Sequence, residues 1–91
     1  MRVVWLPSAR RDLRNLRAYI EADRPRTARA VVLRILDATD ALGAFPERGR
    51  RGQVPETREL VVPRLPYVVV YWIRGGRVEV LRVLHGAQDR P

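Results

Sequence analysis

The sequence predicts one α+β domain, built from a strand, an antiparallel hairpin of two helices and a three-stranded antiparallel meander. In the first half of the chain, apolar residues recur every three or four positions, which is the period of a helix. The second half contains short apolar runs separated by glycine and proline, which are typical of strands. With 91 residues, of which 46% are hydrophobic, the chain can fill one core but not two. We therefore expect a single domain spanning residues 1–91.

The first expected elements are a short strand and a helix. Val3 to Leu6 is an apolar run that Pro7 stops, because proline cannot donate a hydrogen bond to a sheet. Ser8 is placed to cap a helix that runs to about Asp23. One stripe of this helix is apolar and consists of Ala9, Leu13, Leu16 and Ile20. Another face is basic, is interpreted as solvated, and consists of Arg10, Arg14 and Arg17.

A second helix is expected to begin at Pro25, since proline is favoured at the first helical position. Gly43 and Pro46 end it. Its apolar residues again recur at threes and fours and are Ala28, Val31, Ile35, Ala38, Leu42 and Phe45. Two such stripes predict that the helices face each other in an antiparallel hairpin.

A loop and three strands are expected to follow. Residues 47–56 contain two glycines, a proline and three arginines without periodicity, which indicates a loop. Strands are expected at residues 58–62, 67–73 and 78–85. Gly75 and Gly76 predict a two-residue hairpin turn, because the favoured turn needs positive φ.

That turn also predicts the register of the last two strands. It pairs Ile73 with Val78, and from there each residue before Ile73 pairs, one for one, with a residue after Val78. One face of the sheet should then carry Val68, Val70, Trp72, Leu81, Val83 and His85. The other should carry Tyr67, Val69, Tyr71, Ile73, Val78, Val80, Arg82 and Leu84. Both faces are largely apolar, yet two helices can cover only one of them. We expect the uncovered face to bind a partner.

The composition indicates the chemistry of that partner. All 18 basic residues are arginine, against 10 acidic residues, and the net charge is +8. This balance favours an acidic partner, whether nucleic acid, an anionic surface or an acidic protein segment. With no cysteine and one histidine, we expect no disulfide, no thiol catalysis, no metal site and no cofactor. No apolar run is long enough to span a membrane or form a signal peptide, so we expect a cytoplasmic protein without a membrane partner.

Six collinear strings add a family resemblance. They are SARRDLRNLRAYI, DRPRTA, LGAFPERGRRG, TRELVV, PYVVVY and VLRVLHGAQ. In this order they resemble the RelE/ParE superfamily of toxins from bacterial type II toxin-antitoxin systems, and the ParE branch in particular. The resemblance implies a growth-inhibiting toxin that a cognate antitoxin neutralises by wrapping a C-terminal segment over it. ParE-like members poison DNA gyrase, whereas RelE-like members cut messenger RNA in the ribosome.

The two activities need different residues. A metal-free ribonuclease requires a base, an acid and cationic groups that converge on one phosphate. By resemblance, the cleft position that is usually arginine in the nucleases is Val68 here. Only Arg58 and His85, with help from Arg82, could supply such groups. This departure favours a toxin that binds gyrase and has no catalytic residue, with ribosome-dependent RNA cleavage by Arg58, Arg82 and His85 as the alternative. A third alternative is a non-toxic module that only binds an antitoxin.

The expected partner is therefore an antitoxin whose acidic amphipathic segment covers the sheet, and the expected target is gyrase, with the ribosome or messenger RNA as the alternative. Arg82 could instead pair with a helix carboxylate, and Trp72 could belong either to the core or to the interface. The expected partner-binding residues are Arg50, Arg51, Arg58, Val68, Val70, Trp72, Leu81, Val83, His85 and Gln88.

Overall fold

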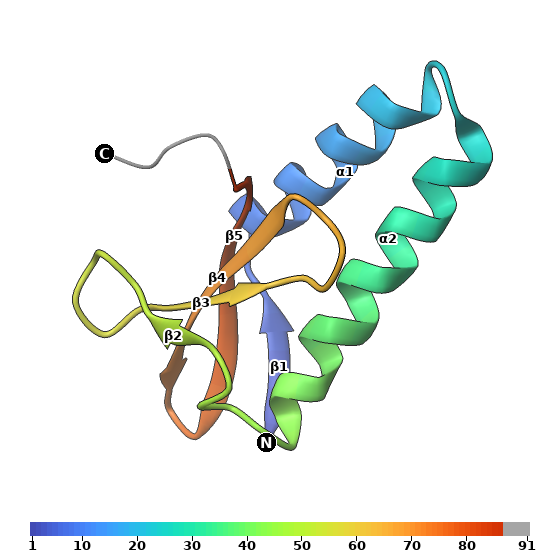
Figure 1. Ribbon diagram of the computed structural model, residues 1–91. Coiled ribbons are helices and arrows are strands. Elements are labelled where there is room, and N and C mark those ends of the chain that lie inside the picture. Colours follow the sequence, from blue (N-terminus) through green and yellow to red (C-terminus); the bar gives the residue numbers. More distant parts are fainter. Residues whose placement is uncertain (87–91) are drawn as a thin grey trace.

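The computed structural model describes residues 1–86 and has two helices packed on one face of a five-stranded sheet (Figure 1). In chain order the elements are β1 (Arg2–Trp5), α1 (Pro7–Glu21), α2 (Pro25–Asp40), a 3-10 turn (Ala41–Gly43), β2 (Arg50–Arg51), β3 (Arg58–Val61), β4 (Tyr67–Arg74) and β5 (Arg77–His85). The strand order across the sheet is β1-β5-β4-β3-β2. The α+β class and the expected strand, helix hairpin and meander are confirmed.

The sheet contains one strand that the sequence did not predict. Arg50 and Arg51 were expected in a loop, but they form the edge strand β2 and pair with Glu59 and Arg58 of β3. The strand β1 pairs with β5 in parallel, while all the other pairs are antiparallel. β5 therefore lies between β1 and β4 in the sheet.

The helix boundaries differ from the prediction at three points. Pro7 begins α1 instead of ending β1, and Ser8 is not the cap, since its hydroxyl donates to the carbonyl oxygen of Leu81 at 2.6 Å. α2 begins at Pro25 as predicted, but its α-helical part ends at Asp40. Phe45 was expected in the apolar stripe, yet it lies beyond the 3-10 turn and is 55% exposed.

The hairpin of β4 and β5 begins as predicted and then changes register. Gly75 and Gly76 have φ angles of 59° and 71°, so the turn uses the positive φ that glycine allows. Ile73 pairs with Val78, as expected. Between Val70 and Tyr71 the register shifts by one residue. Beyond this β-bulge, every residue of β5 has a different partner from the predicted one.

The bulge lies where β5 stops pairing with β1 and begins to contact α1. β1 ends at Trp5, which pairs with Val80, and α1 then runs along the same edge of β5. Asp12 of α1 accepts hydrogen bonds from the Val83 backbone N–H at 2.9 Å and from Arg82 Nε at 2.7 Å. Together with Ser8, Asp12 satisfies backbone groups of β5 that β1 no longer reaches.

The register shift corrects the predicted faces. Val83 pairs with Val69 and is 5% exposed in the core, and His85 pairs with Tyr67 on the helix side of the sheet. The prediction that Val83 and His85 lie on the uncovered face was therefore wrong. Arg82 was expected beside the tyrosines but pairs with Val70 and forms an ion pair with Asp12 of α1.

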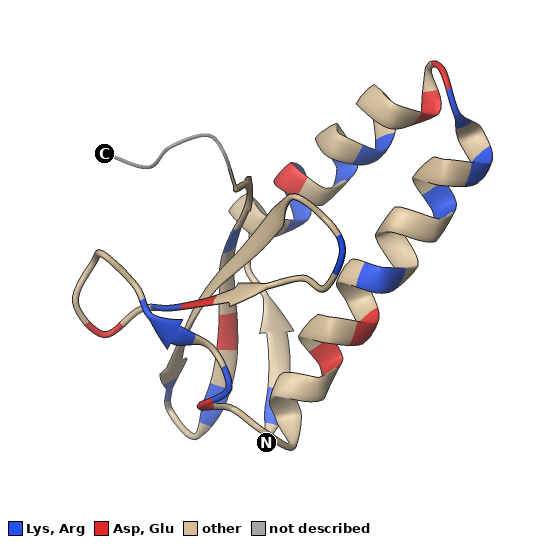
Figure 2. Cartoon of the chain, viewed as in Figure 1, with Lys and Arg blue, Asp and Glu red and all other residues tan. Residues whose placement is uncertain are grey.

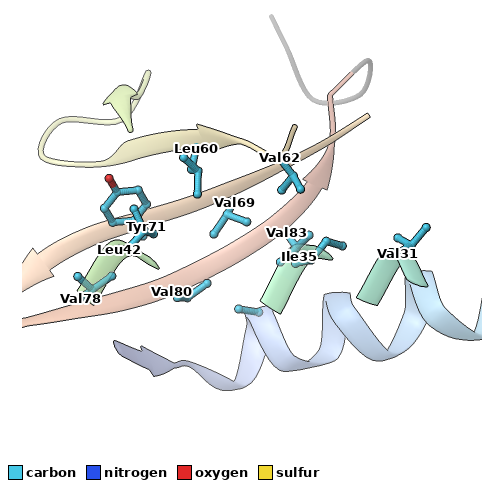
Figure 3. Close-up of a cluster of buried hydrophobic side chains, with 11 residues drawn as sticks. Val31, Ile35, Leu42, Leu60, Val62, Val69, Tyr71, Val78, Val80 and Val83 are labelled. Carbon is cyan, nitrogen blue, oxygen red and sulfur yellow. The ribbon is translucent and has the colours of Figure 1, made fainter. Parts of the chain in front are cut away.

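Both helices and the sheet contribute to the core beneath the covered face (Figure 3). The helical segments contribute Ala9, Val31, Ile35 and Leu42, and the sheet side contributes Leu60, Val62, Val69, Tyr71, Val78, Val80 and Val83. Tyr71 is fully buried, and its hydroxyl donates to the carbonyl oxygen of Pro46 at 2.7 Å and accepts from the N–H of Gly49 at 2.9 Å. A Cβ at position 49 would lie 2.7 Å from that hydroxyl oxygen, so only glycine fits there. Tyr71 thus fixes the 46–49 segment against the sheet.

Replacing Tyr71 with Phe should lower the free energy of unfolding by about 1 to 3 kcal/mol, because the Gly49 N–H and the Pro46 carbonyl both lose their partner. Urea denaturation measures the change. Tyr67→Phe is the matched control, since the Tyr67 hydroxyl makes no hydrogen bond within residues 1–86. Equal losses in the two variants would contradict the role given to the Tyr71 hydroxyl.

Candidate interaction surface

The face of the sheet opposite the helices is called the open face. Its residues follow from the register, because paired residues of neighbouring strands lie on the same face. At the hairpin end, Arg2, Arg77 and Arg74 form one row. At the other end, Leu84 pairs with Val68, which pairs with Val61. The open face therefore changes from charged at the hairpin end to apolar at the far end.

A groove of about 500 Å³ lies at the apolar end of the open face and is called the sheet groove. Val61 is 50% exposed there, whereas Val68 is buried. Arg50 forms part of its wall and is paired with Glu59, with 3.4 Å between Arg50 Nη2 and Glu59 Oε1. The groove is lined by Arg50, Gln53, Val61, Leu65, Pro66, Tyr67, Val68 and Gly86. An apolar floor beside an exposed guanidinium group can accept an apolar side chain next to a carboxylate.

A second cluster on the open face surrounds Trp72. The Trp72 indole N–H donates to Glu79 Oε1 at 2.8 Å, and Arg77 Nη2 lies 2.7 Å from Glu79 Oε2. The guanidinium carbon of Arg74 stacks 3.4 Å from the centre of the Trp72 ring. Hydrogen bonds from Trp72 and then Arg77 hold the pKa of Glu79 below its usual value. Trp72 therefore has contacts of its own within the chain, on the side of the sheet away from the core.

Two expected partner-binding arginines lie away from the open face. Arg58 pairs with the buried Tyr71, and its Nη1 donates to the carbonyl oxygens of Gly49 at 2.9 Å and Glu47 at 3.2 Å. Arg51 pairs with Arg58 and so lies on the same side of the sheet. Arg58 holds the loop before β2 in place. Its expected position beside Val68 was wrong.

The three residues of the nuclease alternative are separated in the fold. Arg58 pairs with Tyr71 and His85 pairs with Tyr67, and these two tyrosines are four residues apart on β4. The backbones of Arg58 and His85 are therefore about 13 Å apart along the strand direction. Arg82 is held by Asp12 at the outer edge of β5. The three groups therefore do not form one cluster on the sheet.

His85 belongs to a different cleft, of about 520 Å³, between α1 and the ends of β4 and β5. Its ring meets the ring of Tyr67 edge to face, with 5.6 Å between the ring centres. Burial, and secondarily the nearby Tyr19, raises the pKa of Tyr67. The cleft also contains Asp12, which already accepts bonds from Arg82 and Val83. His85 therefore has an aromatic contact on the helix side of the sheet.

Of the expected partner-binding residues, the structure brings Arg50 and Val68 together in the sheet groove, with Val70 and Trp72 on the same face. Leu81 lies at the bulge, and Gln88 lies outside the described residues. The prediction missed Val61. This residue lies two positions after Glu59 in the TRELVV run, so alternation along the strand could have placed both on the same face. The prediction also missed Leu84, which only the bulge brings opposite Val68. Within residues 1–86, no three His, Asp or Glu side chains are grouped to hold a metal ion, and no helix is long and apolar enough to cross a membrane.

Comparisons with known proteins agree with this geometry. A family model described as the ParE toxin of the type II toxin-antitoxin system, parDE, matches residues 3–90. The toxin Y4kP of Sinorhizobium fredii is 44% identical over 90 residues, which cover 99% of this chain and 93% of that protein. Toxin RelE2 of Caulobacter vibrioides is 38% identical over 86 residues, covering 94% and 96%. A chain from the solved chromosomal ParDE toxin-antitoxin system of P. aeruginosa has a TM-score of 0.85 at 25% identity, covering 93% of this chain and 95% of that one.

The contribution of the Glu79 carboxylate to stability can be tested by changing the pH. Its pKa is depressed in the folded protein, so its contribution to stability is present above the unfolded value of 4.5 and is lost as the pH falls through the folded pKa. Glu79→Gln keeps an oxygen for Trp72 but removes the charge. The variant should show a flatter dependence of the unfolding free energy on pH between about 5 and 3, measured by urea denaturation. Glu21→Gln, which removes the exposed partner of Arg17, is the control. A slope in Glu79→Gln as steep as in the wild type would refute this role.

Proposed function

This chain belongs to the ParE toxin family of type II toxin-antitoxin systems, and from that premise we propose that it inhibits bacterial growth by binding DNA gyrase in the cytoplasm. The toxin acts as a binder and contributes no catalytic residue. Its partner is an antitoxin, as the family and the ParDE structural neighbour imply.

One observation supports the gyrase target over RNA cleavage. Each candidate catalytic group is already engaged in a contact that shapes the fold: Arg58 with the 47–49 loop, Arg82 with Asp12, and His85 with Tyr67. Moving Arg58 and Arg82 onto one phosphate would break the bonds that hold the 47–49 segment and α1 to the sheet. A toxin that only binds its target needs no such rearrangement.

The antitoxin is proposed to cover the open face through the sheet groove. An apolar side chain would fill the space above Val61 and Val68, and a neighbouring carboxylate would meet Arg50. The net charge of +8 adds long-range attraction for an acidic segment, which speeds association and weakens with salt. Arginines are spread along both helices and β2, so the attraction is not confined to one end of the molecule (Figure 2).

Purified toxin added to gyrase and supercoiled plasmid should trap cleavage complexes or abolish supercoiling. His85→Ala should retain this inhibition, because His85 has no chemical step to perform. Normal supercoiling by gyrase at saturating toxin, without trapped cleavage complexes, would contradict the proposal. Primer extension on translated messages tests the alternative. A cut in the messenger RNA that the wild type makes and His85→Ala does not make would identify a ribosome-dependent nuclease. Unaffected growth on induction without the antitoxin would indicate a module that only binds its antitoxin.

The sheet groove can be tested by placing a carboxylate in it. Val61→Glu should weaken binding of the antitoxin by about tenfold or more, because the new carboxylate replaces part of the apolar floor and repels the partner's carboxylate beside Arg50. The ligand is the cognate antitoxin, which is to be sought in a small protein encoded immediately upstream of the toxin gene, and calorimetry gives the affinity. Val54→Glu makes the same charge change at a residue that is 62% exposed and does not line the groove. Equal affinities of the two variants would place the antitoxin elsewhere.

A further inference from the structure

The hairpin end of the open face carries three arginines in one row, called the arginine row. Arg2 pairs with Arg77, and Arg77 pairs with Arg74, so the three residues lie side by side on β1, β5 and β4. All three are exposed. The row spans two strand spacings, or about 10 Å. Along β4 it is six residues from Val68, so about 20 Å separate it from the floor of the sheet groove.

The turn beyond the arginine row leaves room for a large partner. Gly75 and Gly76 connect Arg74 to Arg77, and a Cβ added at either glycine would meet no atom within 4 Å. The guanidinium groups thus flank a turn that has no side chains of its own. This turn lies at the opposite end of the molecule from the turn between α1 and α2 (Figure 1). Basic residues also lie at the neighbouring ends of β1 and β5 (Figure 2). A bulky charged backbone can therefore approach the row.

Carboxylates of the chain neutralise the arginine row only in part. Arg77 Nη2 lies 2.7 Å from Glu79 Oε2, and Arg74 Nη2 lies 3.3 Å from Oε2 of the exposed Glu56. Arg2 forms no ion pair within residues 1–86. Arg74 and Arg77 lie directly opposite each other, where like charges repel. A partner with closely spaced negative charges would offset this repulsion.

We propose that the arginine row binds the phosphate backbone of duplex DNA, so that the toxin contacts the DNA of the gyrase–DNA complex directly. Guanidinium groups donate paired hydrogen bonds to phosphate oxygens. A row of about 10 Å matches about three phosphates of one strand, which follow each other about every 3.4 Å along the helix axis. Glu79 accepts from Arg77 Nε at 2.9 Å and holds that side chain in place. This inference rests on the proposed function, because it adds a contact with DNA to the binding of gyrase.

The chemistry of the arginine row favours DNA over a protein segment. An acidic amphipathic segment needs an apolar floor for its uncharged side chains. Beside the row, the guanidinium group of Arg74 already covers the Trp72 ring, with 3.4 Å between its central carbon and the ring centre. A second copy of the chain would bring another +8 charge. A phosphate backbone needs only the guanidinium groups that the row presents.

Fluorescence anisotropy with a labelled DNA duplex, in the absence of gyrase, measures this contact. The row variant is Arg2→Gln/Arg74→Gln/Arg77→Gln. The control variant removes the same charge from exposed arginines of the helices and is Arg11→Gln/Arg29→Gln/Arg34→Gln. The row variant should bind DNA about tenfold more weakly or worse, and the control should lose about threefold or less. The slope of log affinity against log salt should fall by about 2 to 3 in the row variant, because each phosphate contact releases about one counterion. Equal losses, or an unchanged slope in the row variant, would overturn the inference.

A single substitution tests the contact without breaking an ion pair. Arg2→Gln should lower the salt slope by about 1, and an unchanged slope would contradict the phosphate contact. Circular dichroism verifies that all the variants fold. Single-stranded RNA of the same length should compete more weakly than the duplex, because its charge density is lower. Stronger competition by the RNA would assign the row to RNA and overturn the inference.

A crosslinking arm locates the hairpin tip in the complex with gyrase. The chain has no cysteine, so Glu56→Cys carries one photoreactive label beside Arg74, and Ala22→Cys carries it at the end of α1 as the control. The label at position 56 should crosslink to DNA in the presence of gyrase, and the label at position 22 should not. Crosslinking of position 56 to gyrase alone would overturn the inference. Because the anisotropy is measured without gyrase, a toxin that binds DNA through the row but leaves gyrase active would refute the proposed function and leave the DNA contact standing. A toxin that inhibits gyrase while the row variant keeps its DNA affinity would do the reverse.

Discussion

The side of β5 that faces β1 and α1 determines which residues lie on each face of the sheet. Its first half is paired with β1 as far as Val80, and its second half meets α1, where Ser8 and Asp12 bond to its backbone. Asp12 also holds Arg82, so one carboxylate fixes the strand, the helix and the position of the bulge. Without the bulge, Val83 would leave the core and Leu84 would leave the open face. The composition of both faces therefore follows from a contact between residues 71 positions apart.

The arginine surplus does not hold the fold together. In the ion pairs of Arg50, Arg74 and Arg77 with glutamates, the arginine side chains are 57%, 50% and 45% exposed, although Glu59 and Glu79 are mostly buried. Ion pairs with a solvent-exposed partner contribute little to stability. Stability comes from the buried face, where Val69, Val78 and Val80 are fully enclosed, and from the Tyr71 hydroxyl bonds. Most of the positive charge is thus left for association with other molecules, in agreement with the acidic partner that the composition predicts.

The sequence predicted the elements whose signals are local. Pro25 marked the start of a helix, and Gly75 with Gly76 marked the turn, because each residue type restricts its own backbone. The two-residue strand β2 has no such signal, since its pairing depends on β3 folding back over it. On the candidate surface, Val68 and Trp72 were placed on the correct face because β4 alternates along its whole length. Val83 and His85 follow the extra residue that the bulge adds to β5, so their faces could not be read from alternation.

The buried core bears on how the antitoxin would neutralise the toxin under our proposal. Val61 and Val68 line the sheet groove from β3 and β4. Beneath the sheet lies a layer that includes the fully buried Ile35 and Val69. Because protein interiors are close-packed, we expect an antitoxin in the sheet groove to leave the helices in place. Neutralisation would then come from covering the open face and not from a conformational change in the toxin.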